Sequence, residues 1–357
     1  MKASHSTIYL FASAALFTFT SLSAVETDPV GYVTETIKAQ TFNLFGLNLS
    51  SPIVTSGSLE SASGTTLTDA HADFTSTLAG GSEYFIKITS GDSELGLNTG
   101  VIAGSATTLT TDDDISSVIS AGTTYEIRKV LTVADIFGSN NSVELKGATA
   151  GDRSNADIIW IPDGLGGYTR VYYNATARTF PPLSVGWKTT SGADANAAST
   201  PIYFTSGVLI QVQRTAFDLN EAGVDSEDLT TKDIVIAGSV QLENTQMILE
   251  PGFNFISRVF PGDITLGESD LEFDIAQAAA GDLSNADIIW VPDGAGGYSR
   301  YYYNGTARIF PPLSIGWKRT SAGDSDVSGA TISSGFIIER KGVAKMITMK
   351  IPDSVTL

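Results

Sequence analysis

The feature of this 357-residue chain that most constrains its fold is a long internal repeat. Residues 152–190 align without a gap to residues 282–320, and only nine of the 39 aligned positions differ. Several of the differences exchange like for like, such as Ile161 with Val291. An internal repeat of this length indicates that the chain builds one structural unit twice.

The similarity extends upstream more faintly. Gly31 to Val33 aligns with Gly238 to Val240, and Phe42 to Leu44 aligns with Phe253 to Phe255. The first copy is interrupted, however, because the offset is 209 residues between Pro52 and Pro261 but only 133 between Thr132 and Thr265. The difference, 209 − 133 = 76 residues, indicates an insertion in the first copy.

These observations predict the domain organisation. We expect a signal peptide at residues 1–24, a first repeat unit at 25–57 plus 130–214, an inserted small β-domain at 58–129, an acidic linker at 215–234 and a second repeat unit at 235–357. The last segment, from Gly342, resembles the strands that open each unit. We therefore expect it to pair with the domain just completed.

The repeated string predicts β-structure. Ile288 to Val291 is an apolar run of strand length, and Pro292-Asp293-Gly294 then signals a turn. A second run, Tyr298 to Tyr303, completes a hairpin before a predicted turn at Asn304-Gly305. We predict an all-β fold of tandem antiparallel β-sandwich or barrel-like units, with short helices only near Val133 to Phe137.

The first 24 residues and the composition predict the compartment. Lys2 precedes an apolar run from Ile8 to Phe19, and small residues follow, as in a secretory signal peptide. The chain has no cysteine, and its formal net charge is −18. Such acidity disfavours nucleic acid and anionic lipid as partners. We expect a secreted or cell-envelope protein without membrane insertion, whose partners are a second copy of itself or a surface polysaccharide or protein.

Alternation along the second strand of the hairpin defines the candidate ligand-binding residues. Tyr168, Arg170 and Tyr172 share one face in the first copy, and Tyr298, Arg300 and Tyr302 share it in the second. Because an unpaired arginine is costly to bury, we expect this face to be exposed. Two interpretations stay open: a platform on which sugar rings stack, or cross-strand packing with arginine over an aromatic ring. The four tryptophans, Trp160, Trp187, Trp290 and Trp317, are expected in the core.

No metal or cofactor site is expected. Asp163 and Asp293 each supply one carboxylate to a glycine-rich turn, whereas calcium requires roughly six to eight oxygen ligands. The cluster Asp112 to Asp114 is expected to face water in a loop. Asn174 and Asn304 fit the glycosylation sequon, but we interpret them as turn residues.

Catalytic residues are also not expected. Beyond the signal peptide the chain has a single histidine, His71, and no nucleophile elbow. A carboxylate pair could hydrolyse glycosides without histidine, but the sequence brings no two carboxylates together. We therefore predict a protein that is not an enzyme.

Several motifs resemble a family of uncharacterised exported β-rich proteins that is multiplied in Verrucomicrobia and related bacteria. They are TDPVGYVTETI, FNLFGLNLSSP, TTLTD with TYEIRK, ADIIWIPDG, YYYN, GW and SGFIIERKG. The resemblance implies export and β-architecture and brings no catalytic residue. The leading prediction is a secreted, non-catalytic structural or adhesive protein of the bacterial envelope or extracellular matrix. Carbohydrate binding through the Tyr-Arg-Tyr stripes is the alternative, and a carboxylate-dependent glycosidase is the third.

Overall fold

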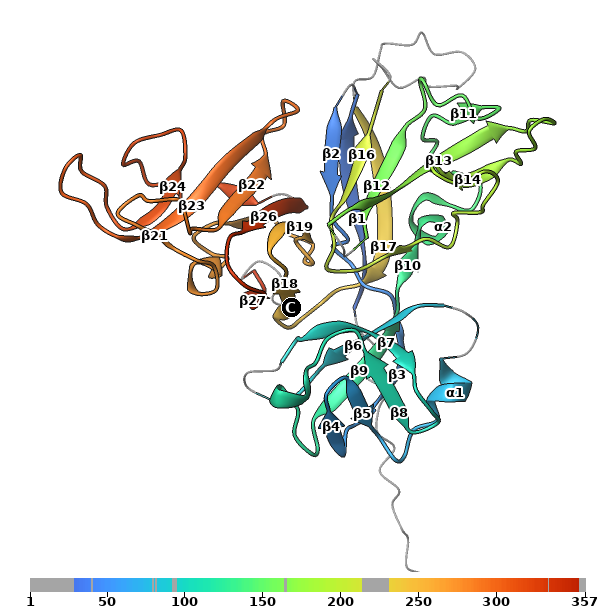
Figure 1. The fold of residues 1–357 in the computed structure, drawn as a ribbon, viewed down its shortest axis with the longest axis horizontal. Helices are drawn as coiled ribbons and strands as arrows, with labels where there is room; N and C mark the ends of the chain where they lie inside the picture. Colours follow the sequence, from blue (N-terminus) through green and yellow to red (C-terminus); the bar gives the residue numbers. More distant parts are fainter. Residues whose placement is uncertain are drawn as a thin grey trace, which may run out of the picture.

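The computed structural model describes residues 29–213 and 231–352, apart from residues 40, 79, 81, 92–94, 164–165 and 333. The predicted signal peptide and residues 215–230 of the predicted linker lie outside the described residues. Antiparallel sheets dominate, and the helices are very short, so the predicted all-β fold class is confirmed. Figure 1 shows three sheet bodies, with the second unit in orange to red and the inserted domain mostly in teal.

The first unit is built on a six-stranded sheet with the order β2-β16-β12-β13-β11, in which β14 pairs with β13 outside this path. Its strands are β2 (Phe42–Phe45), β11 (Ala148–Thr149), β12 (Ile158–Pro162), β13 (Tyr168–Thr176), β14 (Gly186–Thr189) and β16 (Val208–Gln211). A two-stranded pair, β10 (Leu131–Thr132) with β15 (Pro201–Ile202), and the helix α2 (Val133–Phe137) lie beside it. The helix stands where the sequence predicted one, and Thr132 and Asp135 form its capping box.

The second unit has the same strand order, β19-β26-β22-β23-β21, with β24 paired to β23. Its strands are β19 (Gly252–Ser257), β21 (Ala278–Ala279), β22 (Ile288–Pro292), β23 (Tyr298–Thr306), β24 (Gly316–Arg319) and β26 (Gly335–Arg340). The pair β20 (Ile264–Thr265) with β25 (Thr331–Ile332) and the 3₁₀ turn η2 (Leu271–Phe273) accompany it. The register agrees as well, because Trp160 lies opposite Arg170 and Trp290 lies opposite Arg300.

The inserted segment forms its own seven-stranded sheet with the order β3-β9-β6-β7-β8-β5-β4. Its elements are β3 (Ile53–Ser58), β4 (Ser61–Ser63), β5 (Thr66–Thr68), α1 (Phe74–Thr77), β6 (Tyr84–Ile88), β7 (Asn98–Ala103), β8 (Thr108–Thr111), η1 (Ser116–Val118) and β9 (Thr124–Lys129). Leu67, Ile86 and Tyr125 belong to a separate apolar cluster beneath this sheet. The sheet begins at Ile53, ahead of the predicted boundary at residue 58.

The strand that follows the linker, β17 (Thr231–Ser239), pairs along its whole length with β1 (Val30–Lys38) of the first unit. Gly31 and Gly238, which the sequence alignment made equivalent, are therefore partners in one antiparallel ladder. β17 closes the first unit. The second unit is closed in the same way, because the last strand, β27 (Lys345–Met349), pairs with β18 (Thr245–Leu249), as expected for a chain end that returns to the domain just completed.

The two units pack against each other through equivalent segments. The N–H of Gly207, at the start of β16, donates to the carbonyl oxygen of Phe255 at 2.9 Å. The equivalent glycine of the second unit, Gly335 at the start of β26, lies close to β2 of the first unit. A Cβ added to Gly335 would stand 2.8 Å from the Leu44 side chain. Glycine at these positions permits the close approach of the two backbones.

The hairpin turns of the two units make matching contacts. Lys38 Nζ of the first unit donates to the carbonyl oxygen of Gly294 in the β22–β23 turn at 2.7 Å. Tyr168, at the end of the β12–β13 turn, packs edge to face on Phe255 of β19, with 5.2 Å between the ring centroids. The hairpin turn of each unit thus contacts the first strands of the other unit, as in an interface with twofold symmetry.

One apolar cluster contains buried residues of both units, among them Phe45, Trp187, Ile256 and Trp317. Phe85 of the inserted domain belongs to the same cluster. Because burial of apolar surface is the main source of stability, this continuity joins the two units into one core.

Candidate functional site

The structure places the two Tyr-Arg-Tyr stripes on the outer faces of the β12–β13 and β22–β23 hairpins. Arg170 and Arg300 are exposed, and each guanidinium lies over a tryptophan ring, 5.0 Å from the centroid of Trp160 and 5.2 Å from that of Trp290. The arginines therefore take part in the cross-strand cation–π contact that one of the two interpretations expected, with tryptophan as the ring.

The expectation that the whole stripe is exposed was wrong for its last tyrosine. Tyr172 and Tyr302 are only 4% and 6% exposed. The segment that contains β11 covers the first of them with Ala148 and Ala156, and the equivalent segment around β21 covers the second. These short strands pair parallel to the end of β13 and β23 and so turn an outer face into a small second core.

Tyr168 and Tyr298 are half-buried. Burial raises the pKa of Tyr168 to about 12, with smaller contributions from Tyr298 and Asp163. Tyr168 lies where the two units meet, because its ring packs on Phe255 of β19. What stays open to solvent on each stripe is mainly one arginine over one indole, which is a smaller surface than predicted.

The tryptophans divide into two pairs. Trp187 and Trp317 are buried, 1% and 2% exposed, as predicted. Trp160 and Trp290 are only partly buried, contrary to the core prediction, because they lie on the outer face of the sheet, where Phe42 and Phe253 pack edge to face on them. The indole N–H groups of this outer pair donate to Gln211 and Glu339, both at 3.2 Å.

The glycine-rich turns and the sequon asparagines serve the fold. Asp293 Oδ1 accepts hydrogen bonds from the N–H groups of Ala295 and Gly297, at 2.8 and 2.9 Å, and so closes the β22–β23 turn. Asn174 and Asn304 are fully buried inside β13 and β23. The turn predicted at Asn304-Gly305 therefore does not form. The Asn304 side-chain amide instead accepts a hydrogen bond from the Gly281 N–H and donates to the carbonyl oxygens of Thr306 and Ser314.

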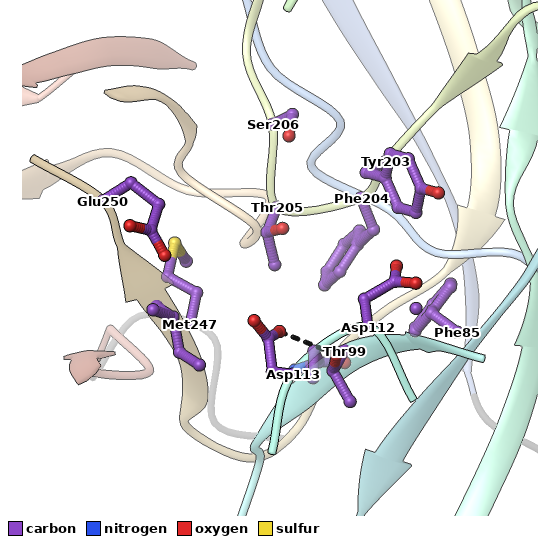
Figure 2. Close-up of a pocket in the computed structure, with 13 residues that line it drawn as sticks. Phe85, Thr99, Asp112, Asp113, Tyr203, Phe204, Thr205, Ser206, Met247 and Glu250 are labelled. Carbon is purple, nitrogen blue, oxygen red and sulfur yellow. Dashed lines mark hydrogen bonds between the residues drawn. The ribbon is translucent and has the colours of Figure 1, made fainter. Parts of the chain in front are cut away.

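Sequence reasoning missed a pocket where the three sheet bodies meet (Figure 2). The cavity measures about 220 Å³. It is lined by Phe85, Asn98, Thr99, Gly100, Asp112 and Asp113 of the inserted domain, by Tyr203, Phe204, Thr205 and Ser206 of the first unit, and by Met247, Ile248 and Glu250 at the start of the second. No local motif could reveal this site, because each wall comes from a different part of the chain.

The apolar side of this junction pocket is built from two stacked rings. Phe85 of β6 and Phe204 lie nearly parallel, with 6.1 Å between centroids and 9° between planes. Tyr203 stands beside them, and its hydroxyl donates to Glu83 Oε2 at 2.7 Å. Burial and this hydrogen bond to a carboxylate raise the pKa of Tyr203, so the phenol stays neutral at physiological pH.

The junction pocket is also lined by the carboxylates of Asp112, Asp113 and Glu250. Asp113 Oδ2 accepts a hydrogen bond from Thr99 Oγ1 at 2.8 Å (Figure 2). Burial, together with the neighbouring carboxylates of Asp113 and Glu83, raises the pKa of Asp112. Asp112 and Asp114 are nevertheless exposed, as predicted for a water-facing loop, whereas Asp113 is partly buried. Asp114 accepts hydrogen bonds from Ser116.

The walls of the junction pocket are fixed relative to one another. Lys87 of β6 is buried and donates to Gln241 Oε1 at 2.8 Å, and it pairs with Glu243 at 3.1 Å. Glu250 is held at the rim by Asn254, whose side chain accepts from the Glu250 N–H and donates to its carbonyl oxygen. These contacts tie the inserted domain to the connection between β17 and β18.

A second unexpected feature is a pair of exposed aromatic loops, here called the tip loops, at residues 178–185 and 308–315. In each loop a backbone pair, Arg178 with Leu183 or Arg308 with Leu313, closes the turn with hydrogen bonds of 2.8 and 2.9 Å. The leucines are buried, but Phe180 and Phe310 are both 88% exposed. The tip loops thus hold one phenyl ring each in solvent on a braced backbone.

The base of each tip loop is held by the same ionic contact. Lys188 and Lys318 are buried, and their ammonium groups pair with Asp194 and Asp324 at 2.6 and 3.0 Å. The same carboxylates accept hydrogen bonds from Ser184 and Ser314 in the loops.

His71, the histidine that the sequence analysis considered for catalysis, is exposed and lies 3.7 Å from Glu60.

None of the helices in the described part of the chain is long and apolar enough to span a bilayer. Comparisons of the chain with protein-family models, with curated proteins and with solved structures find no match. The site is therefore interpreted from its own residues.

Proposed function

We propose that this chain is an exported, non-catalytic adhesive protein of the bacterial envelope or extracellular matrix, and that the two tip loops make its adhesive contacts. The observation that carries this proposal is the duplicated exposure of Phe180 and Phe310. An isolated exposed apolar residue needs no explanation, but the same ring held out by the same braced loop in both units indicates a contact surface.

The bracing supports this interpretation. Arg178 Nε and Arg308 Nε each donate to a proline carbonyl oxygen of their own loop at 3.0 Å. A rigid aromatic ring loses little conformational entropy when it binds, so such a ring gains affinity from preorganisation. The flat phenyl face beside two prolines fits the apolar face of a sugar ring, and we assign the adhesive contact to a neutral extracellular polysaccharide.

The placement of the tip loops supports attachment at two points. The strands that follow them, β14 and β24, lie at opposite sides of the molecule (Figure 1). One molecule can therefore contact two polymer chains and join them. Two linked contacts also raise the overall affinity without any new interaction.

The test uses beads coated with neutral polysaccharide from the producing cells. We expect the wild-type protein to bind the beads and to clump them. The single variants Phe180→Ser and Phe310→Ser should bind but no longer clump, and the double variant should bind at least tenfold more weakly. Phe273→Ser is the matched control, because Phe273 is 74% exposed but lies in η2, outside the tip loops.

Clumping that persists in the double variant, or an equal loss in Phe273→Ser, would overturn the assignment to the tip loops. Export is tested separately by fractionating cells and medium, where we expect the protein outside the cytoplasm and shortened at its amino end.

A further inference from the structure

We propose that the junction pocket binds an organic cation, namely a primary ammonium or guanidinium group carried on an apolar stem. This site is distinct from the tip loops and does not depend on their function. It combines a cavity, an aromatic wall and carboxylates from two of the three sheet bodies (Figure 2).

The lining of the junction pocket is negatively charged. Asp112, Asp113 and Glu250 line it, and no lysine, arginine or histidine lies among its described lining residues. The Asp112 N–H donates to the carbonyl oxygen of Gly100 at 3.0 Å, but among the described residues its carboxylate has no hydrogen bond or ion pair. Its carboxylate lies directly over Gly100, where an added Cβ would be only 2.0 Å from Asp112 Oδ2. Charges brought together without a counter-charge are unfavourable, so an occupant that brings a positive charge is stabilised here.

The arrangement of the carboxylates suits an organic cation better than a metal ion. Calcium takes six to eight oxygen ligands in a compact shell, but no group of three or more acidic or histidine side chains among the described residues is arranged to hold a metal. An ammonium group has only three donors, and a guanidinium has five. Such groups are satisfied by carboxylates that stand on different walls of a cavity.

Apolar side chains in the junction pocket can contact the stem of the ligand. Phe204 and Phe85 are each 5% exposed and Met247 is 4% exposed, and all three line the cavity together with the carboxylates. An alkyl stem packs against such a wall, and an aromatic ring also attracts a nearby cation. A bare inorganic cation would use neither contribution. A side chain of lysine or arginine type, or a small diamine, uses both.

The test is calorimetric titration of the whole chain with three probes. They are 1,5-diaminopentane, N-acetyl-lysine amide and N-acetyl-norleucine amide, of which the last has the stem without the charge. We expect the two amines to bind and the norleucine derivative not to bind. Preference for diaminopentane would assign the site to free amines, and preference for the lysine derivative would assign it to a protein side chain.

Variants locate the binding. Asp112→Asn and Glu250→Gln should each weaken amine binding by about tenfold, the effect expected for one charge-assisted hydrogen bond. Asp282→Asn is the matched control, since this carboxylate is exposed in the second unit and only accepts hydrogen bonds in its own turn. Neither pocket variant should unfold below the wild-type temperature, because neither carboxylate has a described partner to lose and Asp112→Asn removes a repelled charge.

Equal binding of the norleucine derivative, unchanged amine affinity in both pocket variants, or tighter binding of a neutral oligosaccharide would overturn the proposal. Failure here would leave the bead experiment unaffected, because the tip loops are made of other residues.

Discussion

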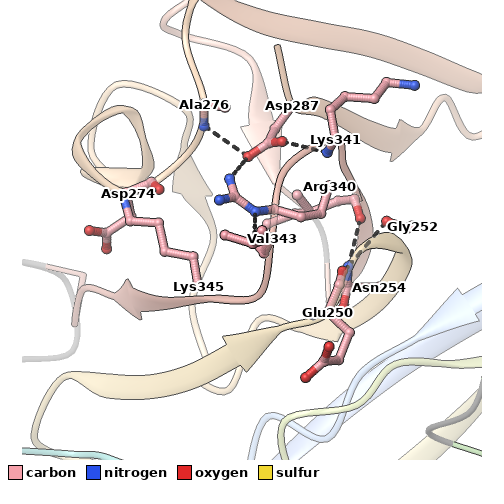
Figure 3. A network of polar contacts seen from close by, with 11 residues as sticks. Glu250, Gly252, Asn254, Asp274, Ala276, Asp287, Arg340, Lys341, Val343 and Lys345 are labelled. Atoms are coloured by element: carbon pink, nitrogen blue, oxygen red, sulfur yellow. Dashed lines mark hydrogen bonds and ion pairs between the residues drawn. The ribbon is translucent and has the colours of Figure 1, made fainter. Parts of the chain in front are cut away.

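The two units share a hairpin and a strand order but stabilise them with different chemistry. In the second unit Asp287 is fully buried at the start of β22, where it pairs with Arg340 and accepts the N–H groups of Ala276 and Lys341, both at 2.8 Å (Figure 3). In the first unit Asp157 is equally buried and also accepts a backbone N–H, but Val212 stands at the position of Arg340.

A second contrast concerns the buried tryptophans. Trp187 Nε1 donates to the carbonyl oxygen of Gly138, at the end of α2, at 2.8 Å. Trp317 Nε1 is buried without a hydrogen-bond partner among the described residues. The repeated string therefore determines the hairpins, while the unrepeated segments around them decide which buried groups are satisfied.

The largest effect is expected from Arg340→Met. The variant leaves the Asp287 charge buried without its ion-pair partner, which typically costs 3–5 kcal/mol. Because two backbone N–H groups still bind the carboxylate, we expect about 3 kcal/mol, measured by urea unfolding. Lys341→Met is the control, since Lys341 pairs with Glu339 near the surface and should cost at most about 1 kcal/mol. Equal losses in the two variants would contradict the importance of the buried Asp287–Arg340 pair in the second unit.

Replacement of the two buried tryptophans by phenylalanine sharpens the comparison. Both variants lose the same volume, but only Trp187→Phe leaves a partly buried carbonyl oxygen, that of Gly138, without its donor. We expect Trp187→Phe to destabilise the protein by about 1–2 kcal/mol more than Trp317→Phe. Thermal and urea unfolding measure the difference, and a larger loss in Trp317→Phe would show that packing outweighs the hydrogen bond.

The ionic contacts at the base of the tip loops should behave alike. Hydrogen bonds from Lys188 and Ser184 lower the pKa of Asp194 to about 2, and those from Ser314 and Lys318 lower that of Asp324 to about 2. A lowered pKa in the folded state contributes stability that is complete above the ordinary value of 3.8 and is lost as the pH falls towards 2. Asp194→Asn and Asp324→Asn should each flatten the dependence of melting temperature on pH between about 4 and 2, and to a similar degree.

The smallest effect is expected from the exposed rings. Phe180→Ser and Phe310→Ser should change the free energy of unfolding by no more than about 0.5 kcal/mol, as is usual for surface positions. The measurement also serves the bead experiment, because an unchanged stability shows that any lost adhesion comes from the lost contact. A loss above 1 kcal/mol in either variant would mean that the ring packs on its own unit.

The sequence predicted the strands better than the surfaces. Alternation and turn residues located the β12–β13 and β22–β23 hairpins, because a strand with one buried face records that burial every second residue. The burial of Tyr172 and Tyr302 could not be predicted in this way. It depends on β11 and β21, which are two residues long and carry no periodic signal.

The junction pocket illustrates the same limit. Asp112 and Asp113 attracted attention as an acidic run, but Glu250 stands 137 residues beyond Asp113. Only the packing of the inserted domain against both units brings these carboxylates to one cavity. The alignment of Gly31 with Gly238 failed for a related reason, since two strands that pair with each other have similar patterns of buried residues.

The matching contacts at Gly207 and Gly335 have a consequence for the stability of the assembly at low protein concentration. An ordinary pair of identical subunits separates on dilution, because its halves must find each other by diffusion. Here the halves belong to one polypeptide, so their local concentration is set by the connecting chain and does not fall on dilution. Covalent continuity also allows one half to carry an extra domain that the other lacks, an asymmetry that two copies of the same subunit could not have.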